Sequence, residues 1–187
     1  LDRRLADAAA GSARSPAGAL AARTAAKRPL VISHTGARAL VDHPRNTSDA
    51  TIKAVADKGG VTGVYFMPFL RIGGPATMAD VLDHIDHVAK VAGEDGVGIG
   101  TDNGVLPLGM NAGAKKRQDD WTRQRIAQGI ASPGEGVGIY PFVEELNRID
   151  RYRVVAAQLA KRGWSQRRLE KLFGGNFLRV YREAWGG

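Results

Sequence analysis

The stretch Leu30-Val31-Ile32-Ser33-His34-Thr35-Gly36, which leads on to Asp42-His43-Pro44-Arg45-Asn46, decides the fold of this chain. Apolar and β-branched residues run directly into a histidine and then into a polar turn that contains glycine. This pattern is typical of a buried parallel strand that brings a ligand or catalytic side chain to its C-terminal end. A second apolar run, residues 97–100, is followed in the same way by Asp102. Because sites in α/β folds form at the C-terminal ends of strands, His34 and Asp102 are candidate site residues.

Strand and helix patterns alternate through the middle of the chain. Strands are expected at residues 30–34, 61–66 and 97–100, and helices between them at residues 48–58 and 77–91. This alternation predicts an α/β fold with parallel strands and right-handed crossovers. Three strands are too few to close an eight-stranded parallel barrel, so the chain forms either a small open sheet or part of a larger fold.

The remaining segments are expected to contain helices and one long irregular stretch. Residues 1–28 are rich in Ala and Arg but are interrupted by Gly and Pro, which predicts one helix before Gly11 and another from Pro16 to Lys27. An irregular stretch is expected from Asp102 to about residue 146. The other helices are expected at residues 119–130, 148–161, 165–173 and 176–181.

The composition is that of an ordinary globular domain. The 187 residues are 43% apolar and 25% charged, which favours a single domain. No apolar run approaches the ~20 residues that cross a bilayer, so we expect a soluble chain without a membrane-spanning segment. The absence of cysteine excludes disulfides and thiolate metal sites. The compartment stays undecided, with the cytoplasm favoured over the periplasm.

The net charge of +8 raises the question of an anionic partner. About half of the excess lies in residues 1–28, and a second basic cluster is Lys115-Lys116-Arg117 with Arg123 and Arg125 beyond it. Neither cluster is interleaved with stacking aromatic residues, and no nucleic-acid-binding motif accompanies them. A solvated charged surface is therefore the simpler interpretation, and we expect no nucleic-acid partner.

Four short blocks combine glycine with histidine, arginine or acidic residues. They are Ser33-His34-Thr35-Gly36-Ala37-Arg38-Ala39-Leu40 with Asp42-His43-Pro44-Arg45-Asn46, Asp83-His84-Ile85-Asp86-His87, Gly98-Ile99-Gly100-Thr101-Asp102, and Gly174-Gly175-Asn176-Phe177-Leu178-Arg179-Val180. In this order and approximate spacing, the blocks resemble the renal (membrane) dipeptidase family. The resemblance implies a (β/α)8 TIM-barrel metallopeptidase that binds two zinc ions and cleaves dipeptides. The single domain, residues 1–187, would comprise a C-terminal half-barrel at 29–187 and a degenerate Ala/Arg-rich helical segment at 1–28.

The resemblance also implies roles for three residues. His34 falls on the second of two histidines that bind one zinc, and a neutral imidazole is a suitable zinc ligand. Arg45 falls on the arginine that binds the carboxylate of the substrate, which its planar guanidinium can do with two hydrogen bonds. Asp102 falls on the acid that takes a proton from the attacking water and passes it to the leaving amine.

The chain also departs from the family pattern. The other histidine of that zinc lies 21 residues before the one matched by His34, and this sequence has Ala13 there. The histidine-x-aspartate pair and the bridging glutamate of the family belong to an N-terminal half that has no counterpart in this chain. One of five metal-binding side chains therefore remains.

These observations lead to three hypotheses. The first is a zinc-dependent dipeptidase whose other ligands come from an absent N-terminal half or a partner chain. The second is a catalytically inactive, truncated or degenerate homologue that acts through association, because an open half-barrel would expose sheet edges and an apolar face. The third is a basic nucleic-acid-binding domain, which steeply salt-dependent DNA binding would reveal.

The same residues have plainer interpretations. A single histidine after an apolar strand, such as His34, is more often a hydrogen-bonded structural residue than a ligand. Arg45 and Asp102 are equally well interpreted as structural ion-pair partners. His84 and His87 are three residues apart on one helix, a spacing that can bind a metal, although they alternate with acids on what we expect to be a solvated helix. The tryptophans are interpreted as packing residues; they are Trp121, Trp164 and Trp185.

Overall fold

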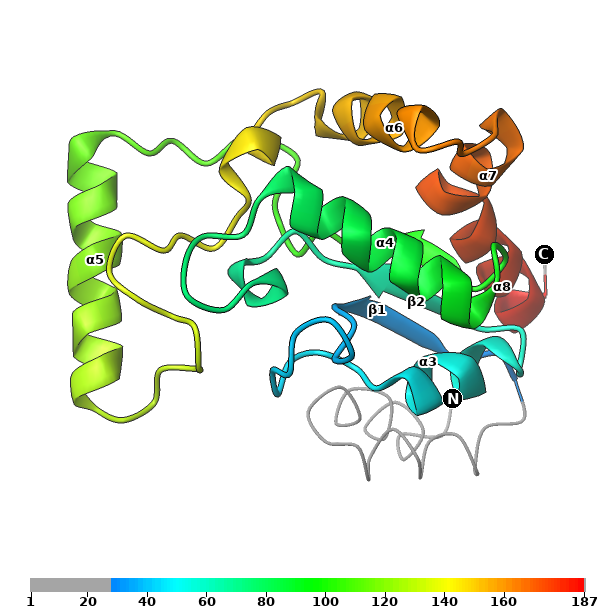
Figure 1. Ribbon diagram of the computed structural model, residues 1–187, viewed down its shortest axis with the longest axis horizontal. Coiled ribbons are helices and arrows are strands. Elements are labelled where there is room, and N and C mark those ends of the chain that lie inside the picture. The colour runs from blue at the N-terminus through cyan, green and yellow to red at the C-terminus, as the bar shows by residue number, and fades with distance from the viewer. Residues whose placement is uncertain (1–27, 187) are drawn as a thin grey trace.

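A computed structural model describes residues 28–186 of the chain (Figure 1). The two helices expected before residue 28, and Ala13 with them, lie outside the described residues. The elements, in chain order, are β1 (Val31–Thr35), α3 (Asp49–Ala56), β2 (Val61–Val64), η2 (Pro68–Leu70), α4 (Met78–Ala92), β3 (Val97–Ile99), α5 (Ala112–Ala127), η3 (Glu144–Leu146), α6 (Arg151–Lys161), α7 (Gln166–Glu170), η4 (Lys171–Gly175) and α8 (Asn176–Trp185).

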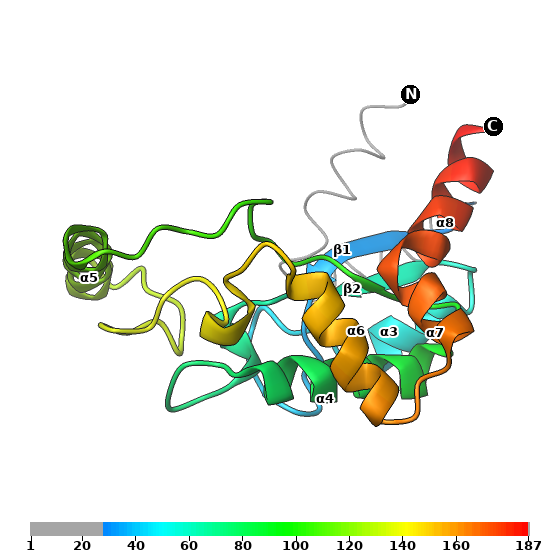
Figure 2. The ribbon, with the colours of Figure 1, turned by 90° about the horizontal axis from the view of Figure 1, so that it is seen from above.

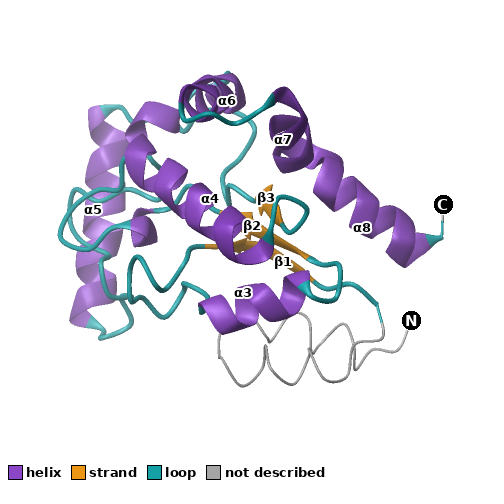
Figure 3. Cartoon of the chain, turned by 45° about the vertical axis from the view of Figure 1, so that its right-hand side comes forward, coloured by secondary structure: helices purple, strands orange, loops and turns teal. Residues whose placement is uncertain are grey.

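The three strands form one parallel sheet in the order β1-β2-β3, which confirms the expected strand–helix–strand alternation. Figure 3 shows the strands at the centre of the molecule with helices around them. The second strand is shorter than expected and ends at Val64. The next two residues still bond to the neighbouring strand ends, because Tyr65 N donates to Thr35 O and Phe66 N donates to Thr101 O. The C-terminal ends of the strands are thereby drawn together.

Local capping fixes where the two crossover helices begin. The Ser48 hydroxyl accepts a hydrogen bond from Thr51 N ahead of α3. A capping box begins α4: the Thr77 hydroxyl accepts from Asp80 N, and the Asp80 carboxylate accepts from Thr77 N at 2.7 Å. Such caps satisfy the first N–H groups of a helix and stabilise it by about 1 kcal/mol each.

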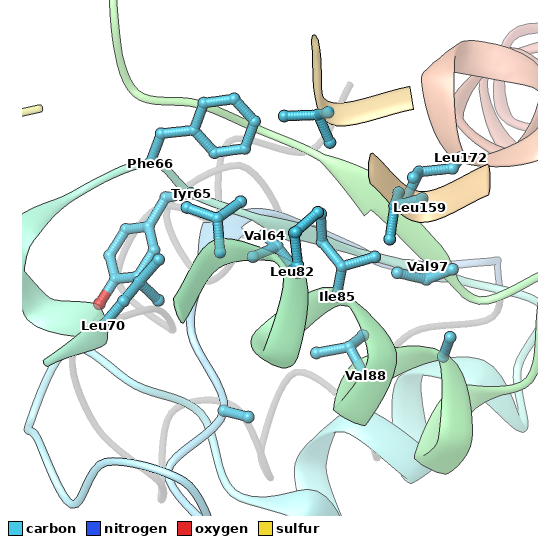
Figure 4. Packing of buried hydrophobic residues seen from close by; sticks show 14 of the residues in the cluster. Val64, Tyr65, Phe66, Leu70, Leu82, Ile85, Val88, Val97, Leu159 and Leu172 are labelled. Atoms are coloured by element: carbon cyan, nitrogen blue, oxygen red, sulfur yellow. The ribbon is translucent and has the colours of Figure 1, made fainter. Parts of the chain in front are cut away.

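One face of the sheet forms the hydrophobic core with α4. Val64 and Val97 from the strands contact Ile85 and Val88 from the helix, and all four side chains are completely buried (Figure 4). Leu159 of α6 is part of the same cluster. Burial of an aliphatic side chain of this size contributes about 1.5–3 kcal/mol, so this face accounts for much of the stability of the chain. Figure 2 shows α3 and α4 together on this side of the sheet.

The opposite face of the sheet is rich in glycine, with Gly63, Gly98 and Gly100. A Cβ atom at Gly63 or at Gly100 would collide with the carbonyl oxygen of Ser33, which lies in the irregular part of β1. A Cβ atom at Gly98 would collide with the ring of Phe177 from α8. No strand of the described sheet has an exposed large apolar side chain. Within residues 28–186, β1 and Phe177 lie against these glycines.

The C-terminal block of glycine, asparagine and arginine, residues 174–180, holds α8 against the start of β3. Gly174 has a φ angle of 152°, which turns the chain between η4 and α8. Asn176 is buried and donates from Nδ2 to the carbonyls of Glu94 (2.8 Å) and Val97 (2.7 Å). Arg179 donates to the carbonyl of Asp95 at 2.8 Å. These hydrogen bonds join α8 to the loop that enters β3 and give backbone carbonyls of residues 94–97 side-chain donors.

The helix α5 differs most from the sequence prediction. It begins at Ala112 rather than at residue 119, because Asn111 caps it by accepting a hydrogen bond from Ala114 N at 2.9 Å. Thr122 is the one buried residue on this helix. Figures 1 and 2 both show α5 at one end of the molecule, away from the sheet.

The interpretation of all three tryptophans as packing residues is wrong for two of them. Trp164 is 5% exposed, whereas Trp121 is 50% and Trp185 is 76% exposed.

None of the helices in residues 28–186 has the length and apolar character needed to span a bilayer.

Candidate active site

The loop after β1 presents Arg45, and backbone-directed hydrogen bonds fix its shape. The hydroxyl of Thr35, at the end of β1, donates to Arg45 O at 3.0 Å and lies 2.9 Å from the hydroxyl of Thr47. Thr47 N donates to Gly36 O at 2.8 Å, which closes the base of the loop. Arg45 is therefore held at the C-terminal end of the sheet by residues on both sides of it.

Asn46 anchors the same loop in the core. Its Nδ2 atom donates to the carbonyls of Val41 (2.9 Å) and Phe69 (3.1 Å), and its Oδ1 atom accepts from the Tyr65 hydroxyl at 2.5 Å. Asn46 and Tyr65 are each 2% exposed. Burial raises the pKa of the Tyr65 phenol well above its ordinary value, so Tyr65 stays a hydrogen-bond donor at any physiological pH.

His84 ties the loop to α4 and is not available to a metal. Its Nδ1 atom accepts from Ala37 N at 2.9 Å, so its Nε2 atom carries the proton and donates to Leu70 O, 3.3 Å away. His84 is 1% exposed, and burial lowers its pKa to about 4. The expectation of a solvated helix face is wrong at this residue. Its neighbour His87 pairs instead with Asp49, with 2.8 Å between Nε2 and Oδ1.

His43 connects the Arg45 loop to a distant part of the chain. Its Nδ1 atom accepts from the backbone N–H of Arg45 at 3.1 Å, which leaves the proton on Nε2 to be donated to Pro133 O at 2.7 Å. The ring is 1% exposed and stacks on Phe69 with 4.7 Å between ring centroids. Burial lowers the pKa of His43, which favours this neutral form.

Arg45 and Asp102 line the same cavity, which has a volume of about 280 Å³. Met67, Pro68 and Phe69 complete the sheet end of the cavity. Residues of α5 and of the segment that follows it form the outer wall; they are Gln118, Trp121, Thr122 and Arg125 from α5, and Glu135, Ile139 and Pro141 from the segment. The structure thus brings together two of the three residues singled out in the sequence. This volume lies at the lower end of the range of ~300–1,000 Å³ for small-molecule sites.

Neither Arg45 nor Asp102 is a structural ion-pair partner within residues 28–186. The Arg45 guanidinium lies over the Phe69 ring, 5.0 Å from its centroid, and no carboxylate lies within 4.0 Å of it in that range. Asp102 has a φ angle of 59° and is the one non-glycine residue with positive φ in the described chain. Backbone conformations of this kind cluster at functional sites. A cation and a carboxylate without an ion-pair partner in residues 28–186 therefore share one cavity.

The outer wall of the cavity has no net charge of its own. Arg125 donates from Nε to the carboxylate of Glu135 at 3.0 Å, and its guanidinium lies 4.7 Å from the centroid of the Trp121 ring. The sequence analysis did not assign these residues to the site. The sequence carries no signal for them, because α5 lacks an apolar periodicity that would point to the sheet.

The basic cluster around residues 115–125 is partly neutralised within the structure. Lys116 and Arg123 both pair with Asp120, at 2.6 and 2.7 Å. These two pairs are exposed, as expected for a solvated charged surface, whereas the Arg125–Glu135 pair is partly buried in the cavity wall.

His34 lies apart from the cavity. It is exposed on β1, on the glycine face of the sheet, and the Ser33 hydroxyl is 2.8 Å from its Nδ1 atom. It does not line the cavity that contains Arg45 and Asp102. No group of three or more His, Cys, Asp or Glu side chains that could bind a metal gathers within residues 28–186. His34 alone does not fit a metal centre, because protein metal sites take three or four ligands.

A second, larger cavity of about 400 Å³ lies beside β3 and has a different character. Its lining contains no acid and no histidine; the residues are Ile99, Tyr152, Arg153, Ala156, Leu172, Phe173, Gly174 and Phe177. The cavity with Arg45 and Asp102 is therefore the candidate active site.

Comparison with known proteins places these features in context. The model of the membrane dipeptidase family (Peptidase family M19) matches residues 9–118 and 128–185. An uncharacterized protein in the pqqA 5' region of Klebsiella pneumoniae is 30% identical over 165 residues, covering 86% of this chain and 48% of that protein. Dipeptidase tcpJ of Claviceps purpurea is 29% identical over 158 residues, covering 83% of this chain and 29% of that protein.

Solved structures agree with the sequence relatives. An amidohydrolase from Pseudomonas aeruginosa has a TM-score of 0.68 and 31% identity, covering 89% of this chain and 49% of that one. A metallopeptidase from Rhodobacter sphaeroides, solved with a phosphinate mimic of the dipeptide L-Ala-D-Ala, has a TM-score of 0.70 and 18% identity, covering 98% of this chain and 46% of that one. The chain spans half or less of the length of these proteins, and its parallel sheet corresponds to part of a TIM-type barrel, as the sequence predicted.

Proposed function

Because the chain belongs to the membrane dipeptidase family, Peptidase family M19, we propose that it forms the substrate-binding side of a dipeptidase. A complementary N-terminal half, on the same or on another polypeptide, would complete the metal-binding side. The observation that supports this division is the cavity that both Arg45 and Asp102 line, neither of them in an ion pair within residues 28–186.

Arg45 would bind the C-terminal carboxylate of a dipeptide. A guanidinium offers two parallel N–H donors that match a carboxylate, and Arg45 has no carboxylate partner in the described chain that would compete. The hydrogen bonds that fix Arg45 O and Arg45 N hold its backbone, so the side chain starts from a defined position. Orientation of this kind lowers the entropy that binding must overcome.

Asp102 would handle the proton during peptide-bond hydrolysis. Its carboxylate can accept a proton from the attacking water and donate it to the nitrogen of the leaving amine. Because Asp102 lines the same cavity as Arg45, one small substrate would contact both residues.

The family is metal-dependent, and we propose two zinc ions for the complete site. His34 would contribute one ligand. Since the described residues supply no cluster around it, the remaining ligands would have to come from the complementary half.

Complementation tests this proposal. The chain is co-expressed with the N-terminal half of the related Pseudomonas aeruginosa amidohydrolase, and zinc content and hydrolysis of Gly-Leu and L-Ala-D-Ala are measured. We expect the chain alone to be inert, and the assembly to contain two zinc ions and to lose hydrolysis on His34→Ala, Arg45→Ala or Asp102→Asn. A stable assembly of the two halves that is metal-free and inert would contradict the proposal and favour a degenerate homologue that acts through association.

A further inference from the structure

One buried imidazole contacts both walls of the candidate active site. The His43 ring bonds on one side to the backbone N–H of Arg45, at 3.1 Å, and on the other side to the carbonyl of Pro133, at 2.7 Å. Pro133 belongs to residues 131–141, which we call the return segment and which leads from α5 back to the body of the chain. Residues 43 and 133 are 90 positions apart in the sequence, so this contact is tertiary.

The two bonds require opposite properties of the ring nitrogens. Nδ1 accepts a hydrogen bond, so it carries no proton, and Nε2 must donate one. One neutral tautomer satisfies both contacts, and packing against Phe69 fixes the plane of the ring. A single side chain therefore joins the backbone of Arg45 to the return segment.

The return segment has few other connections to the sheet end of the cavity. Asn103 donates from Nδ2 to Pro141 O at 2.9 Å, at the end of the segment. The remaining bonds join the segment to α5: Glu135 pairs with Arg125, and Gly138 N donates to the Asp119 carboxylate at 2.9 Å. Both Glu135 and Ile139 line the cavity. The wall formed by α5 and the return segment is thus bonded to the Arg45 loop through His43.

We propose that His43 is a positioning residue that fastens the return segment to the backbone of Arg45, so that the cavity wall and the substrate-binding guanidinium are aligned together. This inference depends on the role proposed above for Arg45. It adds a residue that contacts neither the substrate nor the reacting atoms.

Two substitutions separate the two bonds of the ring. In His43→Asn the amide oxygen can replace Nδ1 as the acceptor for Arg45 N, whereas no donor reaches Pro133 O. In His43→Gln the longer side chain can bring an amide N–H to Pro133 O, whereas the acceptor for Arg45 N is lost. Each variant keeps one contact and serves as the control for the other.

The experiment uses the whole chain and two readouts. NMR titration measures the affinity for N-acetylglycine, which has the carboxylate and the amide carbonyl of a dipeptide, and hydrogen exchange measures protection of the amides of residues 135–139. We expect His43→Gln to weaken binding of N-acetylglycine about fivefold with exchange unchanged, the effect of one ordinary hydrogen bond. We expect His43→Asn to lower protection about fivefold with affinity unchanged.

The results distinguish this inference from the proposed function. If the wild-type chain binds N-acetylglycine but the two variants change both readouts together, or neither of them, His43 is a packing residue and the inference is wrong. If the wild-type chain fails to bind N-acetylglycine, the role proposed for Arg45 is itself wrong, and the positioning role is overturned with it.

Discussion

The substrate side of the candidate site, with Arg45 and Asp102, and its metal side, with His34, differ in how many supporting residues this chain provides. Arg45 is held by Thr35, His43 and the buried Asn46, and it shares a cavity with Asp102. His34, by contrast, is exposed beside Ser33 with no ligand cluster in residues 28–186.

The difference follows from what each task requires. One oriented guanidinium binds a carboxylate, and a single loop can supply it. A metal centre needs three or four ligands, which in a barrel come from several strands. Part of a barrel can therefore keep carboxylate binding without metal binding.

The largest expected effect concerns His84, which supports the substrate side. In the folded chain its pKa is lowered to about 4 by burial, whereas an unfolded histidine titrates near 6.5. The unfolded state binds more protons between these values, so stability is complete above about pH 6.5 and is lost as the pH falls toward 4, by about 3 kcal/mol. Urea unfolding across this range measures the loss. His84→Asn keeps an acceptor for Ala37 N without titrating, so an unchanged pH dependence in this variant would refute the assignment.

Removal of the Arg45 guanidinium should have the next largest effect. We expect Arg45→Ala to weaken binding of N-acetylglycine by about tenfold to a hundredfold, because a charge-assisted bidentate contact is lost. The matched control is Arg123→Ala on α5, since Arg123 pairs with Asp120 and does not line the cavity. Equal affinities for the two variants, measured by NMR titration, would show that carboxylate binding occurs elsewhere.

Tyr65→Phe tests the anchor beneath the Arg45 loop. The substitution removes the hydroxyl that donates to Asn46 Oδ1 and leaves that buried oxygen without this donor, which should lower the free energy of unfolding by about 1–2 kcal/mol. Tyr181→Phe is the control, because Tyr181 is 36% exposed. If urea unfolding gives the same stability for both variants, the Tyr65–Asn46 bond does not support the loop.

The smallest effect is expected on the metal side. His34→Ala should leave both the stability and the affinity for N-acetylglycine of the isolated chain unchanged within about 0.5 kcal/mol, because an exposed side chain with one neighbouring hydroxyl contributes little. A clear loss of either quantity, measured by urea unfolding and NMR titration, would mean that the two sides are already coupled in this chain.

The sequence predicted the parts of the fold that depend on local patterns. The β1 stretch, the helix that begins near residue 77 and the strand–helix alternation all follow from local sequence patterns, and the structure confirms them. The start of α5 was placed too late because Asn111, a capping residue, precedes a charged segment without apolar periodicity.

Tertiary hydrogen bonds explain what the sequence could not predict. Nothing in the local sequence indicates that His43 reaches Pro133, or that His84 turns inward to Ala37. Asp102 was identified from its position after a strand and Arg45 through a family resemblance. The wall residues Trp121 and Arg125 were not identified, because α5 shows no pattern that points to the sheet.

The most direct test of the account is an NMR titration of the chain with N-acetylglycine in the presence of a metal chelator. The reporter is the indole N–H of Trp121, which lines the cavity and can be assigned with Trp121→Phe, and the buried Trp164 is the internal reference. The account predicts a saturable shift of the Trp121 signal and none of the Trp164 signal without any metal. If the Trp121 signal does not respond until zinc is supplied, the substrate side does not form independently of the metal side, and the central claim is wrong.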